Sequence, residues 1–168
     1  PAGYQTKDTA VGFLLHCMKR LKQGGRCGII LPDGAPLSSG TVYEKIRKKL
    51  LEEFNLHTII RLPRSIFAPY TDYATNILFF EDTGPTKEIW YYKMNIPDRI
   101  IQIGIDKGRK IKDPKFNKTN PIKDEDFESI EKWYKNKKES QHAWMVKVVK
   151  EGEDTYLRVV DKDGVHVE

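Results

Sequence analysis

Hydrophobic positions in the first third of the chain recur at the spacing of helix faces. One face lies within Ala10–Leu21 and a second within Val42–Phe54, so the pattern predicts two amphipathic helices. Asp8 or Thr9 can cap the first helix, and Gly24 can end it. The apolar positions that define the two faces are Ala10, Val11, Leu14, Leu15, Met18 and Leu21, then Val42, Ile46, Leu50, Leu51 and Phe54.

Short apolar runs follow the predicted helices. Cys27–Leu31 is typical of a strand buried on both faces, and Leu56–Leu62 and Thr75–Phe80 predict two further strands. Helix, strand, helix and strand with short connections imply parallel strands joined by right-handed crossovers. The link from Leu62 to Thr75 has no helical period. It either returns the third strand antiparallel or forms a long functional loop.

The pattern weakens after Gly84-Pro85. We expect one more strand at Ile89–Tyr92 and a short helix at Asp126–Tyr134. The remaining pattern predicts a loop over residues 95–123 and a terminal hairpin formed by Met145–Val149 and Tyr156–Val160. The chain therefore divides into an α/β region, residues 1–94, and a smaller α+β extension, residues 95–168.

Length and composition exclude several classes of protein. At 168 residues and 19.5 kDa the chain fits one domain that needs no disulfide to fold. Its two cysteines, Cys17 and Cys27, have no metal-ligand spacing and suggest a reducing cytoplasm. No apolar run approaches a membrane span, and no secretory leader opens the chain. We therefore expect a cytoplasmic protein without a metal and without contact to a membrane.

The net charge of +5 is unevenly distributed. Residues 1–80 contain 11 basic and 6 acidic side chains, whereas residues 81–168 are neutral overall. Within the neutral half, Arg99–Lys123 contains 8 basic residues against Asp106 and Asp113. This block either meets a polyanion or forms a solvated loop beside an acidic helix start.

Few residues form a recognisable chemical motif on their own. Gly24-Gly25-Arg26 precedes a strand rather than following one, so it does not fit a phosphate-binding loop. The histidines are scattered and no metal site is predicted. The strand-end loop Pro32-Asp33-Gly34 is better placed, because ligands of open α/β sheets lie at the carboxyl ends of strands. A plain turn explains the same three residues equally well.

A series of longer segments carries more information than any single residue. The pair Phe-Ala-Pro-Tyr at 67–70 and Thr-Asn-Ile-Leu-Phe-Phe at 75–80 is the most specific. In this order and spacing, the segments resemble the modification (M) subunits of type I restriction–modification systems, which are N6-adenine DNA methyltransferases. The resemblance covers most of residues 5–134. Its other segments are 21–26, 29–34, 46–51, 56–63, 84–92 and 118–122.

The resemblance implies both a fold and an absence. The fold is the C-terminal part of a Rossmann-like sheet that binds S-adenosylmethionine, and the family works with a specificity subunit and a restriction subunit on DNA. The glycine-containing cofactor loop and the Asn-Pro-Pro-aromatic motif of the family are missing from this chain. S-adenosylmethionine would then be bound mainly by protein outside the chain, and the chain alone would not methylate. Residues 144–168 depart from the family, so nothing is transferred to them.

The resemblance also implies roles for residues of the 63–74 loop. In related adenine methyltransferases this loop contributes an aromatic ring to the pocket of the flipped base, so Phe67 is the first candidate and Tyr70 and Tyr73 are second. Thr75 and Asn76 match the family motif and would orient the loop. Packing of Phe67 in the core and a simple strand start at Thr75 stay open as alternatives. Candidates for contact with DNA phosphates are Lys45, Lys48, Lys49, Arg61 and Arg64.

These observations leave three functions open. The first is part of an enzyme that methylates the N6 of adenine in DNA, without a metal. The second is a non-catalytic module that binds DNA or a partner subunit. The third is a related fold that acts on RNA or on a small molecule. The missing cofactor loop and Asn-Pro-Pro-aromatic motif distinguish the first two functions, because a chain that lacks them should not methylate DNA alone.

Overall fold

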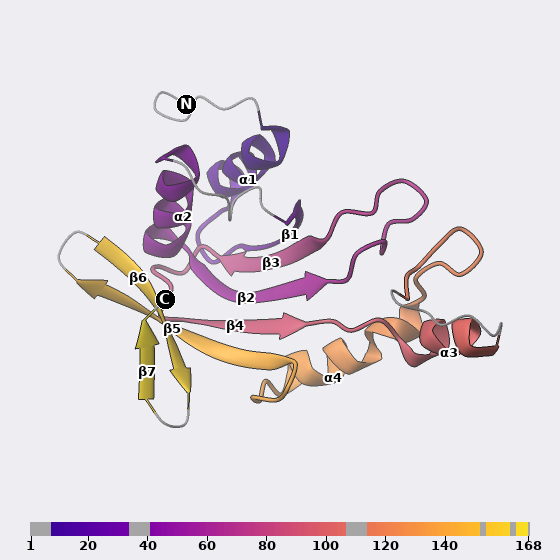
Figure 1. Cartoon of the computed structure of the whole chain (residues 1–168). Coiled ribbons are helices and arrows are strands. Elements are labelled where there is room, and N and C mark those ends of the chain that lie inside the picture. Colours follow the sequence, from indigo (N-terminus) through magenta and orange to yellow (C-terminus); the bar gives the residue numbers. More distant parts are fainter. Residues whose placement is uncertain (1–7, 34–40, 107–113, 152–153, 162–163, 168) are drawn as a thin grey trace.

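The computed structural model describes residues 8–33, 41–106, 114–151, 154–161 and 164–167 (Figure 1). Four α-helices lie within these residues: α1 (Thr9–Arg20), α2 (Thr41–Glu53), α3 (Asp98–Asp106) and α4 (Glu128–Lys135), the last preceded by the 3-10 helix η1 (Asp124–Phe127). The strands are β1 (Arg26–Pro32), β2 (Asn55–Leu62), β3 (Thr75–Glu81), β4 (Glu88–Lys93), β5 (Ala143–Glu151), β6 (Asp154–Asp161) and β7 (Gly164–Val167).

All the described strands form one sheet in the order β1-β3-β2-β4-β5-β6-β7. β3 lies between β1 and β2 and is antiparallel to both, so β1 and β2 run parallel as predicted but are not neighbours. The long link after Leu62 therefore returns the chain antiparallel. β4 continues the sheet parallel to β2, and the remaining strands are antiparallel to their neighbours.

Helices α1 and α2 cover one face of the sheet, which explains their apolar stripes. Asp8 caps α1 by accepting hydrogen bonds from the backbone of Ala10 and Val11, at 2.9 and 3.4 Å. α1 ends at Arg20, and Gly24 forms the following turn with a φ of 72°. The core on this face includes Val11, Leu14, Met18, Ile46, Leu50, Ile59, Leu78 and Phe80.

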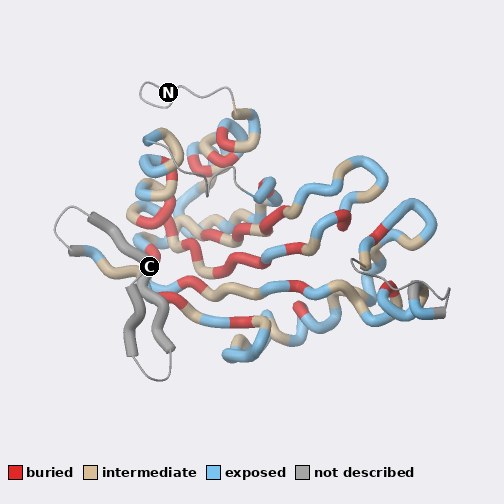
Figure 2. Tube along the Cα trace, viewed as in Figure 1, coloured by how far each residue is buried: buried red, intermediate tan, exposed pale blue. Residues whose placement is uncertain are grey.

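A second core lies on the opposite face, where α4 packs and α3 contributes one isoleucine. Because side chains alternate along a strand, neighbouring residues of β2 enter different cores: Ile59 enters the first and Ile60 the second. Figure 2 shows buried positions along the central strands and on the inner sides of the helices. The second core comprises Ile60, Leu62, Ile66, Met94, Ile100, Phe116 and Ile130.

The prediction that the first strand is buried on both faces is wrong. Among the described residues β1 pairs with β3 alone, so it forms an edge of the sheet. Leu31 packs under α1 and α2, whereas Ile30 on the other side is 48% exposed. The apolar run correctly indicated a strand, but the second face of this strand is left partly exposed, as Ile30 shows.

The second half of the chain differs from its prediction in two places. α3 lies within residues 95–123, where we expected a loop, and β7 extends the terminal hairpin to a third strand. α3 is short and rich in β-branched residues, so local propensity hardly indicates a helix. The predicted strand at Ile89–Tyr92, the helix near Asp126–Tyr134 and the hairpin are confirmed. The division of the chain at residue 94 stays a prediction.

Candidate functional site

Three polar side chains meet where β1 and β2 end and β3 begins. Asp33 follows β1 directly, and its carboxylate accepts a hydrogen bond from Asn76 Nδ2 at 3.1 Å and from the Arg61 guanidinium at 2.6 Å. Arg61 and Asn76 are register partners on β2 and β3. Strand alternation places all three on the face that α1 and α2 cover. They join three strand ends into one polar network.

A backbone hydrogen bond also holds the ends of β1 and β3 together at this junction, the strand ends linked by Asp33, Arg61 and Asn76. Asp33 N donates to Ala74 O at 2.8 Å, so the β1–β3 ladder continues one residue beyond Pro32. Different carboxylate oxygens of Asp33 accept from Arg61 and Asn76, so both are engaged. Asp33 therefore fixes the strand ends that flank the 63–74 loop. Gly34, the third residue of the predicted strand-end loop, lies outside the described residues.

Thr75 and Asn76, the two residues that match the family motif, face opposite sides of the sheet. Both are buried, but only Asn76 joins the network with Asp33. Thr75 pairs in register with Pro32 on β1 and with Leu62 on β2. Its Oγ1 atom is buried without a hydrogen-bond partner among the residues that the structure describes. The motif thus places one satisfied and one unsatisfied polar group at the base of the loop.

The loop between β2 and β3 has a buried base and an exposed tip. Ser65 and Ile66 are buried, and Ser65 adopts a left-handed φ of 62°. The three candidate aromatic side chains point outward to different degrees: Phe67 is 37% exposed, Tyr73 75% and Tyr70 92%. Phe67 is the least exposed of the three, and its role, in a base pocket or packed under the loop, stays a prediction.

A cleft of about 410 Å³ separates this loop from the segment that follows α3. Ser65, Tyr70 and Asp72 line one side, and Lys115, Phe116 and Lys118 line the other. Both segments extend beyond the same end of the sheet in Figure 1. The sequence signal for the second wall is the basic block Arg99–Lys123, but the pattern did not show that this block meets the aromatic loop.

The five basic candidates for phosphate contact are not gathered at one point. Lys45, Lys48 and Lys49 lie on α2, where Lys49 pairs with Glu53. Arg61 is bound to Asp33, whereas Arg64 is exposed just beyond β2. α2 and the loop therefore present separate basic side chains rather than one patch.

A second hollow, of about 440 Å³, lies around the first residues of β2 and β4. Lys137 Nζ donates to the buried Thr58 Oγ1 at 2.6 Å, and burial lowers the pKa of Lys137. Burial, followed by the nearby Lys137 charge, also lowers the pKa of His57, and Glu81 opposes that effect. The hydrogen bond to Thr58 holds the segment after α4 against the sheet, so Lys137 has a structural role.

The described residues contain no group of three or more His, Cys, Asp or Glu side chains that could hold a metal ion. Nor do they include a helix long and apolar enough to cross a membrane. Cys17 and Cys27 are both free thiols, and burial raises the pKa of Cys27 to about 11. Neither a metal centre nor a reactive thiolate is indicated in this part of the chain.

The sequence matches the N-6 DNA methylase family over residues 1–163, so the expectation that residues 144–168 depart from the family is wrong for most of that segment. The chain belongs to this family. The sheet order, the strand-end network and the aromatic loop are therefore features of a family member. The mixed α/β architecture agrees with the Rossmann-like methyltransferase part that the resemblance implied.

Two similar proteins support the same family. The methylase subunit of the type I restriction enzyme EcoEI from Escherichia coli is 40% identical over 153 residues, which cover 87% of this chain and 28% of the relative. The EcoKI methylase subunit from Escherichia coli K12 is 28% identical over 140 residues, covering 78% of this chain and 23% of the relative. The chain thus spans less than a third of these relatives.

A solved structure shows the same arrangement of elements. It is a modification subunit of a type I restriction enzyme from Vibrio vulnificus YJ016. The two structures superpose with a TM-score of 0.76 at 36% sequence identity, over 96% of this chain and 32% of the other. The fold described above is therefore that of one part of a larger subunit in this neighbour.

Proposed function

We propose that this chain forms the C-terminal part of the catalytic fold of a type I modification subunit. Within that subunit, a methyl group would pass from S-adenosylmethionine to the N6 atom of an adenine flipped out of DNA. The observation that supports this most directly is the position of the aromatic 63–74 loop. It leaves the sheet at the strand ends that the Asp33–Arg61–Asn76 network links, in a member of the N-6 DNA methylase family.

The proposed reaction requires the target base to leave the DNA stack. Unstacking costs a few kcal/mol, and stacking on an aromatic side chain returns about 1–3 kcal/mol for each base. Phe67 is our first candidate for this platform, because it is partly exposed next to the buried Ile66, which holds the loop in the core. The polar network fixes both strand ends from which the loop departs, so it would position the ring.

The reaction also requires a binding site for the methyl donor, S-adenosylmethionine. S-adenosylmethionine supplies an electrophilic methyl group when it is bound. Asp33 lies at the ends of these strands, where its two carboxylate oxygens accept one hydrogen bond each, from Arg61 and Asn76. Asp33 thus has a structural role in linking the strands, and the glycine-containing cofactor loop of the family is missing from the chain. We assign the binding of S-adenosylmethionine to parts of the subunit outside this chain.

The names of the relatives, methylase subunits of type I restriction enzymes, support the partners that we propose. DNA is the substrate, and a specificity subunit and a restriction subunit complete a type I complex, which would act in the cytoplasm. Lys45, Lys48 and Arg64 are exposed and suit contacts to phosphates, which position DNA without reading its sequence.

A chimera tests the proposal, because the chain matches only part of each relative. This chain replaces the matching segment of the EcoEI methylase subunit, and transfer of labelled methyl groups to adenine in DNA is measured. We expect transfer by the chimera. We expect Phe67→Ala to slow it by about 5- to 150-fold, the range that corresponds to one lost stacked base. Donor affinity should not change, and Phe13→Ala, an exposed aromatic on α1, is the matched control.

Two results would contradict the proposal. The first is a folded chimera that binds S-adenosylmethionine and DNA but transfers no methyl group. The second is micromolar binding of S-adenosylmethionine by this chain alone in isothermal titration, which would place the donor site within the chain. Equal rates for Phe67→Ala and Phe13→Ala would remove Phe67 from the base pocket and leave Tyr70 and Tyr73 to be tested.

A further inference from the structure

The cleft between the 63–74 loop and residues 115–118 is lined by two kinds of side chain that are far apart in the sequence. On the loop side is the ring of Tyr70, which is almost fully exposed. On the other side are Lys115 and Lys118, and neither ammonium forms an ion pair with any residue that the structure describes. Asp72 is the acidic side chain that lines the cleft, so the lining charge is positive.

The two walls are held together by a shared apolar core. Ile66 below the loop and Phe116 below the second wall belong to the same buried cluster, and both are at most 4% exposed. Ser65 Oγ donates to Arg64 O at 2.5 Å, and Ala68 N donates to Ser65 O at 2.9 Å. The loop and the second wall therefore rest on the same apolar core.

The second wall of the cleft, residues 115–118, runs into a hydrogen-bonded turn formed by Asn117–Asn120. The Asn117 side chain accepts hydrogen bonds from the backbone of Thr119 and Asn120, both at 3.0 Å. The backbones of Asn117 and Asn120 also exchange two hydrogen bonds of 3.1 Å. Because Asn117 uses its side chain within the turn, Lys115 and Lys118 are the groups left to meet a ligand.

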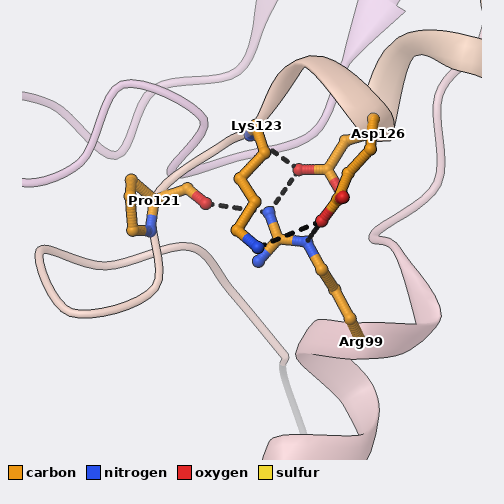
Figure 3. A network of polar contacts seen from close by, with 5 residues as sticks. Arg99, Pro121, Lys123 and Asp126 are labelled. Atoms are coloured by element: carbon orange, nitrogen blue, oxygen red, sulfur yellow. Dashed lines mark hydrogen bonds and ion pairs between the residues drawn. The ribbon is translucent and has the colours of Figure 1, made fainter.

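A polar network anchors this turn to the rest of the molecule (Figure 3). Arg99 of α3 donates to Asp126 Oδ1 at 2.8 Å and to Pro121 O at 2.8 Å, and Asp126 also accepts from the backbone of Lys123. The hydrogen bond from Arg99 holds the pKa of Asp126 below its usual range. The Arg99 guanidinium also lies 6.0 Å from the centre of the Phe116 ring. These contacts tie the end of the turn to α3 and η1.

We propose that this cleft binds the DNA strand next to the flipped base, with a neighbouring base on Tyr70 and backbone phosphates at Lys115 and Lys118. Exposed aromatic rings beside unpaired cations are the features by which proteins hold single strands. A flipped base leaves its neighbours unstacked on one side, which suits an aromatic surface. The inference rests on the proposed function for the identity of the flipped base, but it makes a separate claim about strand binding.

Binding of this chain to a short, fluorescein-labelled single-stranded oligonucleotide tests the claim. Anisotropy is measured over a series of salt concentrations for the unsubstituted chain and for the double variant Lys115→Ala, Lys118→Ala. Loss of two phosphate contacts should reduce the slope of log affinity against log salt by about 1.4 and weaken binding about 25-fold at 0.1 M salt. The matched control is Lys19→Ala, Lys22→Ala, which removes the same charge near the end of α1.

Substitution of Tyr70 tests the stacking contact separately. Tyr70→Ala should weaken binding by about 5- to 150-fold with little change in salt slope, and Tyr70→Phe should retain the affinity. Thermal unfolding of each variant checks that the fold is intact, which we expect because these side chains are exposed.

Three results would overturn the inference. The first is that the unsubstituted chain does not bind the oligonucleotide at low salt. The second is an equal salt slope for the cleft variant and the α1 control. The third is an unchanged slope together with lost assembly of the EcoEI chimera with its partner subunits, which would assign the cleft to a protein contact. Methyl transfer by the chimera is a separate readout: it can succeed while strand binding fails, or fail while strand binding persists.

Discussion

Asn76 and Arg61 both bind Asp33, but they do so in different surroundings. Asn76 is buried at the start of β3, whereas the Arg61 side chain is 55% exposed at the end of β2. An exposed ion pair contributes at most about 1 kcal/mol, because water screens the charges and the side chains lose conformational freedom. A buried amide that loses its partner leaves polar groups unsatisfied at a greater cost. The stability of the junction should therefore depend more on Asn76 than on Arg61.

Two substitutions test this difference. We expect Asn76→Ala to lower the free energy of unfolding by about 1–3 kcal/mol and Arg61→Ala to lower it by less than about 1 kcal/mol. Urea denaturation monitored by circular dichroism measures both. A larger loss for Arg61→Ala than for Asn76→Ala would show that the ion pair, rather than the buried amide, holds the strand ends.

At the scale of elements, α3 and the 63–74 loop depend on contacts with distant parts of the chain. A helix of nine residues is marginal alone, and α3 contains four isoleucines and a glycine. Its buried Ile100 and the loop's Ile66 lie in the same cluster as Phe116. Arg99 adds the polar contact to Asp126. These contacts supply the stability that the local sequence lacks.

Removal of the Phe116 ring should therefore weaken both elements together. We expect Phe116→Ala to lower the free energy of unfolding by about 3–5 kcal/mol, the range for a buried aromatic. Hydrogen exchange should show less protection in α3 and in the 63–74 loop, with α1 protected as before. Phe13→Ala on the exposed side of α1 should change neither quantity. Loss of protection confined to residues 114–120 would mean that the loop is held independently.

At the scale of the whole molecule, one sheet carries two cores on opposite faces. The first is covered by α1 and α2 and the second by α4 with Ile100 of α3. The second core includes Leu62 and Met94 from one side of the proposed boundary at residue 94, and Ile100 and Ile130 from the other. β4 also pairs with β5 across this boundary. We infer that the two regions stabilise each other.

Calorimetry tests this coupling. We expect a single unfolding transition whose calorimetric and van't Hoff enthalpies agree, because the second core draws on both regions. Phe116→Ala should move that transition as a whole rather than split it. Two separated transitions would show that residues 1–94 and 95–168 unfold as independent domains.

The elements of the α/β region could be predicted from the sequence because their signals are local. The apolar stripes of α1 and α2, the cap at Asp8 and the runs of β2 and β3 each depend on residues that are close in the chain. The same holds for the family, whose most specific signal is the pair of segments at 67–70 and 75–80. α3 was missed because its stability comes from Phe116 and Asp126, which are more than ten residues away.

By itself, the sequence determined the helices and strands of residues 8–93, the family and the loop that carries the candidate aromatic residues. The tertiary structure alone decided that β3 lies between β1 and β2, which brings Asn76 to Asp33 and leaves β1 at an edge. It also decided that Lys115 and Lys118 face Tyr70 across one cleft. The physical reason is that spacing along the chain encodes local hydrogen bonding and amphipathic faces. The pairing of distant segments instead depends on burial of a common core.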